Sequence, residues 1–345
     1  MSEIENGGPE GREGGAGEAR TPSADSAAVA ETAERWGTLR SELDRVVIGQ
    51  ARVKEQLLAC LLAGGHALLE GVPGTAKTLL ALCLARLLGG RFRRVQFTPD
   101  LMPADLLGTN VFNQKNQEFE FRPGPIFCDL LLADEINRTP PRTQAALLEA
   151  MQERAATIDG RRYGISPVFS VLATQNPIEF EGTYPLPEAQ RDRFLLKISI
   201  DVPSAAEETE LLAAYSAGHR LHEEAAKTLQ PVLTPEQVVA SRRIVSERIR
   251  VEPALLAYIQ RVVGKTREHE SVQLGAGPRA SLALLDVCRA LALLRGRDFA
   301  TPDDVKEMAG PVLEHRVILT PEAEMEGLRL SDLLRRIFEQ VEVPR

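Results

Sequence analysis

The segment at residues 71–78, with the sequence GVPGTAKT, constrains the fold of this chain more than any other feature. It follows a short apolar run, HALLEG, and it precedes TLLALCLARLL, which is typical of a buried helix. A glycine-containing turn between a strand and a helix lets backbone N–H groups approach an anion, and the N-terminus of the helix adds a partial positive charge. The pattern therefore predicts a phosphate-binding loop in an α/β fold.

Two side chains at the end of this loop carry chemistry that a nucleotide needs. Lys77 supplies a point charge for the β- and γ-phosphates, and Thr78 offers a hydroxyl to Mg²⁺. Ala76 departs from the general pattern, which has glycine before the lysine, and alanine disfavours a positive φ. The alternative is a plain Gly/Pro turn between core elements. We expect the nucleotide to contact Gly71, Val72, Pro73, Gly74, Thr75, Ala76, Lys77, Thr78 and Leu79.

Further along the chain, the string LLLADEIN places two carboxylates directly after a buried run. We expect a strand at residues 130–132 to deliver Asp134 and Glu135 to its carboxyl end, where ligands bind in open α/β sheets. Asp134 would belong to the Mg²⁺ ligand shell, and Glu135 would act as general base on the attacking water. Such a pair alone could be an ordinary acidic loop, but together with a phosphate-binding loop it predicts nucleotide hydrolysis.

The remaining pattern divides the chain into three parts. Residues 1–35 are rich in Gly, Glu, Ala and Ser and have no aromatic residue before Trp36, which predicts a disordered acidic tail. Residues 36–203 alternate short apolar strands with helical stretches, as in a parallel sheet that is covered on both faces. Residues 204–345 show helical periodicity, with Thr-Pro pairs at two helix starts, and predict an all-helical domain.

Composition and charge argue against several classes of protein. The formal net charge is −8 and the sequence pI is about 5.4, which is not the profile of a general nucleic-acid binder. The four cysteines have neither CxxC spacing nor a histidine at ligand spacing, so we expect buried thiols rather than zinc sites or disulfides. Because the sequence shows neither a signal peptide nor an uncharged apolar stretch of about 18 residues, it predicts a cytoplasmic protein without a membrane span.

A set of longer strings resembles the MoxR branch of the AAA+ ATPases. These strings cover the chain from about residue 43 to the last helices, and they are VIGQ, LLEGVPGTAKT, RVQFTPDLMPADLLG, FRPGPIF, LLADEINRTPPRTQAALLEAMQE, ATQNPIEFEGTYPLPEAQRDRF and GPRAS. The alanine at position 76 also fits this branch. The resemblance implies a P-loop α/β ATPase core with a C-terminal helical lid, and ATP and Mg²⁺ as its ligands.

The same resemblance implies roles for residues outside the phosphate loop. Asn176, at the end of the strand VLAT, looks like the sensor-1 residue that positions the attacking water or contacts the γ-phosphate. Arg193 looks like the arginine finger that reaches the γ-phosphate of the neighbouring subunit, with Arg191 as the competing candidate. Arg279 looks like sensor 2, a lid arginine over the phosphates that couples domain angle to nucleotide state. The segment that packs on the adenine is expected to be Val47, Ile48 and Gly49.

Two inserted segments predict β-hairpins. Residues 111–121, VFNQKNQEFEF, have NQKN as a turn signal and look like the insert that interrupts helix 2 in this clade. Residues 156–167, ATIDGRRYGISP, contain DG and YG turn signals. In related rings such hairpins face the pore or the client, although each could be a surface hairpin without a partner.

The function implied by the resemblance is a chaperone-like ATPase. Identical subunits would form a ring, expected to be a hexamer, and would remodel a separate client protein with a von Willebrand A domain or a metal site. A nucleic-acid-dependent motor is the alternative, since related rings translocate DNA and DGRRYG holds two arginines, but the acidic net charge opposes it. A third hypothesis, a nucleotide switch that does not hydrolyse ATP, is opposed by Glu135, because binding alone needs no general base.

Overall fold

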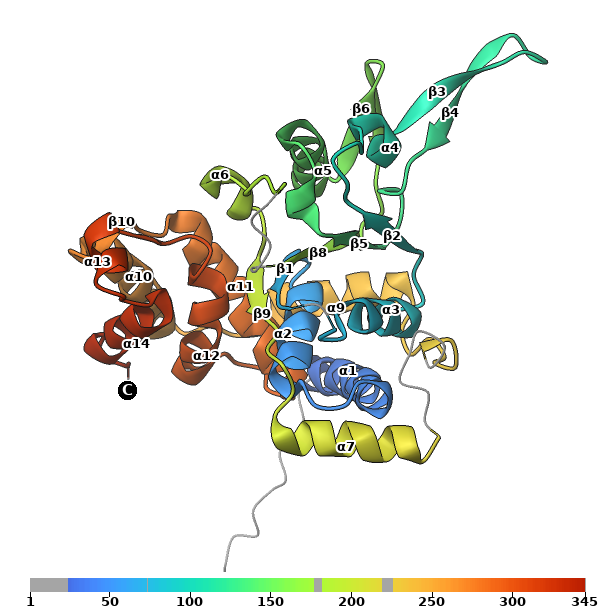
Figure 1. Ribbon diagram of the computed structural model, residues 1–345. Coiled ribbons are helices and arrows are strands. Elements are labelled where there is room, and N and C mark those ends of the chain that lie inside the picture. The colour runs from blue at the N-terminus through green and yellow to red at the C-terminus, as the bar shows by residue number, and fades with distance from the viewer. Residues whose placement is uncertain (1–23, 73, 177–181, 219–225, 345) are drawn as a thin grey trace, which may run out of the picture.

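The computed structural model describes residues 24–72, 74–176, 182–218 and 226–344, and its centre is a five-stranded parallel sheet (Figure 1). The strand order is β2-β5-β8-β1-β9. The strands are β1 (Ala67–Glu70), β2 (Phe92–Gln96), β5 (Leu130–Asp134), β8 (Ser170–Gln175) and β9 (Leu196–Ser199). Because all neighbouring pairs are parallel, their carboxyl ends meet at one edge of the sheet. The predicted parallel α/β core is therefore confirmed.

Side chains that alternate along the strands divide the core between the two faces of the sheet. Leu132 belongs to the hydrophobic cluster on one face and Leu131 to the cluster on the other. The helices of the first cluster include α1 (Ala24–Val46), α2 (Ala51–Leu62) and α3 (Lys77–Leu87), and the second cluster includes α5 (Pro141–Glu153). Three short helices complete this part of the chain: α4 (Pro103–Leu107), η1 (Ile136–Arg138) and α6 (Glu188–Arg191).

The C-terminal part is helical, as its periodicity predicts. It comprises α7 (Ala205–Ser216), α9 (Pro235–Arg248), α10 (Pro253–Glu268), α11 (Pro278–Leu294), α12 (Pro302–Leu313), α13 (Pro321–Met325) and α14 (Leu330–Gln340), with a small antiparallel pair of β10 (Val272–Leu274) and β11 (Ile318–Leu319). Reciprocal capping boxes start α7, α9 and α12 at Ser204, Thr234 and Thr301.

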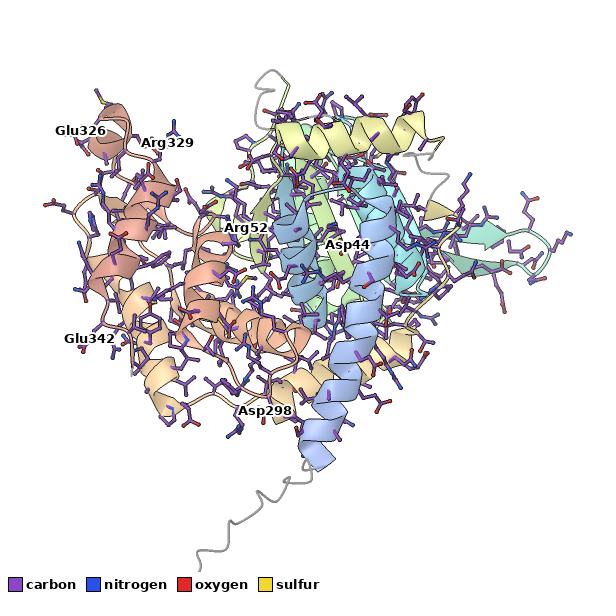
Figure 2. All side chains as sticks on the ribbon, turned by 90° about the horizontal axis from the view of Figure 1, so that it is seen from below. Asp44, Arg52, Asp298, Glu326, Arg329 and Glu342 are labelled. Carbon is purple, nitrogen blue, oxygen red and sulfur yellow. The ribbon has the colours of Figure 1, made fainter. Side chains whose placement is uncertain are left out.

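The C-terminal helices and the sheet share one continuous hydrophobic core. Helices α9 and α11 pack against α1 and α2, and their buried side chains belong to the same hydrophobic cluster as the first face of the sheet. Seen from below in Figure 2, the helices α10, α12, α13 and α14 lie to one side of α1 and α2. Among the described residues, no helix is both long and apolar enough to cross a membrane.

The N-terminal helix α1 corrects the prediction of a disordered tail over residues 1–35. Helix α1 begins at Ala24, so the last third of that predicted tail is helical, while residues 1–23 lie outside the described part of the chain. The alanines of this stretch favour a helix, and Val29 and Trp36 are buried against the core. Burial of one face of α1 supplies the stabilisation that composition alone did not reveal.

Both predicted hairpins are present. Strands β3 (Gly108–Asn113) and β4 (Glu118–Pro123) form an antiparallel hairpin that projects well beyond the sheet in Figure 1. Near its tip Phe112 and Phe119 are exposed and meet edge to face, with ring centroids 5.3 Å apart. The second hairpin consists of β6 (Ala155–Ile158) and β7 (Arg161–Gly164).

Candidate active site

The loop between β1 and α3 adopts a backbone that its sequence partly opposes. Ala76 has φ 62° and Gly74 has φ 87°, both in the left-handed region. Gly74 is suited to this conformation, whereas the Cβ of Ala76 makes it costly. Gly71 is required for a different reason, because a Cβ there would lie 2.5 Å from the backbone oxygen of Ile200. The alanine that departs from the general pattern is therefore accommodated by local strain.

Lys77 is the first residue of α3 and is held by the loop that it closes. Its Nζ donates hydrogen bonds to the carbonyl oxygens of Gly71, at 2.5 Å, and Val72, at 2.8 Å. Burial lowers the pKa of Lys77, while the nearby carboxylates of Asp134 and Glu135 raise it. The ammonium group is thus preorganised between the phosphate loop and the end of β5, where an anion would bridge it to the helix N-terminus.

Asp134 ends β5 and is held by two neighbouring strands. Thr174 of β8 donates from its hydroxyl to Oδ1 of Asp134 at 2.6 Å, and accepts from the backbone N–H of Glu135 at 2.8 Å. Arg94 of β2 donates to Oδ2 of Asp134 at 2.8 Å. Thr174 is buried, so it fixes the carboxylate firmly, whereas the Arg94 side chain is 45% exposed and its ion pair is weak enough to be exchanged for another cation.

Glu135 lies just beyond the strand, with φ 57°. Its Oε2 accepts from Nε2 of Gln96 at 2.5 Å and pairs with Nε of Arg138 at 3.0 Å. Gln96 is opposite Asp134 in the register between β2 and β5, which explains how it reaches the next residue. In this arrangement Glu135 is turned toward β2, and Gln96 and Arg138 hold it there.

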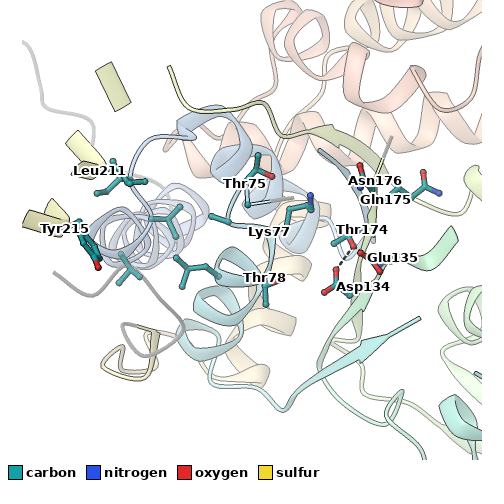
Figure 3. A pocket seen from close by; sticks show the side chains of 16 residues that line it. Thr75, Lys77, Thr78, Asp134, Glu135, Thr174, Gln175, Asn176, Leu211 and Tyr215 are labelled. Atoms are coloured by element: carbon teal, nitrogen blue, oxygen red, sulfur yellow. Dashed lines mark hydrogen bonds between the residues drawn. The ribbon is translucent and has the colours of Figure 1, made fainter. Parts of the chain in front are cut away.

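These residues surround a cavity of about 880 Å³ (Figure 3). Eleven of the predicted site residues line it, namely Val47, Ile48, Gly74, Thr75, Ala76, Lys77, Thr78, Leu79, Asp134, Glu135 and Asn176. Five residues that the sequence analysis missed also line it: Val46, Thr174, Gln175, Leu211 and Tyr215. In Figure 3, Lys77 and Asp134 lie toward one end, and Leu211 and Tyr215 of α7 lie at the other. The cavity therefore has a charged end and an apolar end, as a nucleotide requires.

Three predicted contacts are not part of the cavity wall. Gly71 and Val72 instead bind Lys77 through their carbonyl oxygens. Gly49 has φ 67° and faces Glu207 at the start of α7, and Glu207 accepts from the backbone N–H of Gln50 at 3.0 Å. Pro73 lies outside the described residues. Gly49 thus contributes to the attachment of α7 rather than to the cavity.

Arg193 and Arg279, the predicted arginine finger and the predicted sensor 2, lie away from this cavity. Arg193 and Arg279 line a separate cavity of about 330 Å³, together with Asp192 and Arg316, and neither lines the nucleotide cavity of the same chain. Nη1 of Arg279 donates to Oδ2 of Asp192 at 3.0 Å. Arg279 does not line the nucleotide cavity of its own chain in this arrangement, and its role as a lid arginine over the phosphates stays a prediction. The N-terminus of α11 lies beside the segment that follows α6, not beside the phosphate loop.

Arg191 and Arg193 differ in their surroundings. Arg193 also lines a cavity of about 430 Å³ with residues of α5 and of the β6–β7 hairpin. Nε of Arg191 is buried and has no hydrogen-bond partner among the residues that the structure describes. The preference for Arg193 over Arg191 as the arginine finger stays a prediction.

Comparisons with known proteins agree with this geometry. Residues 66–196 match the family described as "ATPase family associated with various cellular activities (AAA)", and residues 264–337 match the AAA lid domain. The chaperone MoxR1 of Mycobacterium tuberculosis is 42% identical, and the match covers 96% of this chain and 91% of MoxR1. The chain belongs to the MoxR family of AAA ATPases.

Two further relatives support this assignment. The protein YeaC of Bacillus subtilis is 46% identical over 89% of this chain and 94% of YeaC. The crystal structure of a proposed ATPase from Cytophaga hutchinsonii superposes with a TM-score of 0.84 at 38% identity, covering 92% of this chain and 98% of that one. The chain thus has the architecture of an AAA ATPase core with its lid over nearly its whole length.

Proposed function

We propose that this MoxR-family protein is a Mg²⁺-dependent ATPase that works as a ring of identical subunits and remodels a separate protein client. The observation that carries the proposal is the convergence of Lys77, Asp134 and Glu135 on one cavity with a charged and an apolar end. A triphosphate fits the charged end, and an adenine fits the apolar end.

The residues at the charged end match the chemistry of phosphoryl transfer to water. The backbone of the loop and Lys77 would bind the β- and γ-phosphates, and Asn176 would orient the attacking water. Glu135 would accept the proton of that water. For this step the carboxylate of Glu135, which lines the cavity, must give up its hydrogen bond with Gln96, so that contact describes a resting position.

The donor set at the metal position fits Mg²⁺. Thr78 and Asp134 offer a hydroxyl and a carboxylate on the same cavity wall, and Mg²⁺ prefers such hard oxygen ligands. The exposed Arg94 pairs with one oxygen of Asp134 and can be displaced. A magnesium ion held there would neutralise charge on the β- and γ-phosphates. Loss of ATP affinity on chelation of Mg²⁺ is the expected result.

Among the described residues, Lys77 is the cation that lines the nucleotide cavity and no arginine lines it, so in a ring the neighbouring subunit would supply one. Arg193 and Arg279 share a cavity that is separate from the nucleotide cavity, so we propose that both serve the neighbouring subunit. In this proposal Arg279, the sensor-2 residue, acts on the nucleotide of the neighbouring subunit and not on that of its own subunit. Each nucleotide would then lie between the phosphate loop of one subunit and the arginines of the next.

A protein client is proposed from the family and from the hairpins. MoxR1 is named a chaperone, and the β3–β4 hairpin presents two exposed aromatic rings far from the sheet. Exposed aromatic pairs are suited to binding another protein. We propose a client with a von Willebrand A domain or a metal site, in keeping with the family resemblance.

The decisive variant is Glu135→Gln, which keeps the shape of the site and removes the base. We expect turnover to be lost while ATP stays bound, and the trapped assembly to retain its client in a pull-down. Stimulation of the wild-type ATPase by DNA instead of by a captured protein would favour a nucleic-acid motor. Unchanged turnover in the variant would remove Glu135 from the mechanism.

The trans arrangement is tested with mixed assemblies. Arg193→Ala subunits should be inactive alone and should regain turnover when Glu135→Gln subunits are added, because these supply an intact finger to a neighbouring Glu135. If mixing gives no gain over the separate proteins, the two residues act within one chain and the proposal of a shared site is wrong.

A further inference from the structure

A buried arginine of the lid, Arg316, binds the backbone of the segment that carries Arg193. Arg316 follows α12 and its side chain is only 3% exposed. Its guanidinium donates to the carbonyl oxygens of Phe194, at 2.6 Å, Leu195, at 3.2 Å, and Asp192, at 3.4 Å. It also binds the carbonyl of Val312 in the last turn of α12. Arg316 thus ties the backbone on both sides of Arg193 to the lid.

Asp192 joins this arginine to a second one. Its Oδ1 accepts from Nε of Arg316 at 2.8 Å, and its Oδ2 accepts from Nη1 of Arg279 at 3.0 Å. The carboxylate therefore sits between a buried arginine that fixes it and a half-exposed arginine that it holds. The buried pair has little freedom, whereas the exposed pair can open when a stronger anion approaches Arg279.

The neighbouring His315 adds a second anchor of the same kind. Its Nε2 lies 2.9 Å from the carbonyl oxygen of Phe194, so that nitrogen carries the proton and donates. Burial and the adjacent Arg316 keep the pKa of His315 well below its usual value, and the ring is neutral. Two consecutive lid residues therefore bind the same short segment, which makes a shared rigid unit.

From these contacts we propose that Asp192 is a positioning residue that holds Arg279 beside Arg193, with Arg316 fixing Asp192, so that both arginines meet the phosphates of the neighbouring subunit together. The inference rests on the proposed trans function of Arg193 and Arg279. It assigns to Asp192 and Arg316 a role in the neighbour's site rather than in their own. The lid and the finger would then move as one body.

The test is Asp192→Asn in full-length protein, which keeps the size of the side chain and removes its charge. We expect kcat to fall by about 10- to 100-fold, as for a misplacement of catalytic groups, while KM for ATP stays within about twofold. Adding Glu135→Gln subunits should restore turnover to the same fraction as for Arg193→Ala. The matched control is Asp298→Asn, which removes another lid carboxylate that pairs with an arginine, Arg250, at 3.2 Å (Figure 2). This control should retain full activity.

The outcomes separate the two proposals. If Arg193→Ala is not rescued by mixing, the trans function itself fails. If Arg193→Ala is rescued but Asp192→Asn keeps its kcat, or loses activity that mixing does not restore, the positioning role of Asp192 is overturned. Should Asp192→Asn fail to fold, Arg316→Lys, which keeps the charge but not the planar fork, is measured in the same way. It should show the same rescue, and a defect without rescue would overturn the inference.

Discussion

The nucleotide cavity and the arginine cavity differ in how much of their chemistry one chain can complete. In the nucleotide cavity, the phosphate loop, the proposed metal ligands Thr78 and Asp134 and the proposed base Glu135 come together within a single subunit. In the arginine cavity, Arg193 and Arg279 lie with Asp192 and Arg316, and none of the described residues predicted to contact phosphate or metal lines it. Binding of ATP should therefore be a property of the chain, and fast hydrolysis a property of the assembly.

Removing one cation from each cavity tests whether ATP binding and ATP hydrolysis depend on different cavities, and it should give the largest effects. Arg193→Ala should lower kcat by about 10³-fold or more, the range of arginine fingers, with the Kd for ATP unchanged. Lys77→Ala should instead weaken ATP binding by at least about tenfold, because it removes a charge-assisted contact to the phosphates. Isothermal titration and steady-state kinetics on both variants give the two numbers. Equal losses of affinity in both would show that the cavities are not functionally separate.

A pH series compares two buried histidines, His315 of the lid and His66 of the sheet core. Burial lowers the pKa of His315, so this side chain is neutral in the folded protein. As the pH falls below about 6.5, the unfolded state therefore binds one more proton at His315 than the folded state does. The resulting loss of stability is small at pH 7, grows as the pH falls below about 6.5, and amounts to at most about 2 kcal/mol at pH 5. In urea unfolding, His315→Gln should remove this part of the loss.

His66, which directly precedes β1, should continue to contribute to the loss of stability at low pH in the His315→Gln variant. Burial lowers its pKa to about 3, and its Nδ1 accepts from the backbone N–H of Val171 at 2.9 Å. The same dependence on pH in wild type and variant would mean that His315 is protonated in the folded lid, contrary to its surroundings.

The apolar end of the nucleotide cavity offers a smaller effect. Tyr215→Ala should raise the Kd for ATP by about tenfold, since stacking of a base on an aromatic ring contributes about 1–3 kcal/mol. Binding of inorganic tripolyphosphate, which has no base, should not change. Leu212→Ala is the control, because Leu212 is a 61% exposed neighbour on α7 that does not line the cavity. A loss of tripolyphosphate affinity would show that Tyr215 acts through the fold of α7 instead.

The smallest effect concerns the strained loop itself. Ala76→Gly should stabilise the protein by about 0.5–1 kcal/mol, because the left-handed conformation penalises a Cβ more than glycine loses in entropy. The same change at Ala81, buried inside α3, should destabilise by at least about 1 kcal/mol. Chemical denaturation of both variants compares them, and destabilisation by Ala76→Gly would show that the loop is not strained there.

Local sequence signals were sufficient for the phosphate loop, the carboxylate pair and most element boundaries. The loop is one contiguous segment between a strand and a helix, and Asp134 follows directly from an apolar run. Capping residues and a proline at the first helical position predict where lid helices begin. In each case the signal and the structure lie within a few residues of each other, so no knowledge of distant packing was needed.

What the sequence alone determined is therefore the nucleotide-binding chemistry, while the tertiary structure decided what surrounds it. Arg94 and Gln96 reach the carboxylates only because β2 lies next to β5, and Tyr215 reaches the cavity only because α7 returns to it. The placement of Arg279 beside Asp192 depends on how α11 and α12 pack against the core. Strand order and helix docking are set by contacts between residues far apart in the chain, and such contacts leave no periodic or adjacent signal in a single sequence.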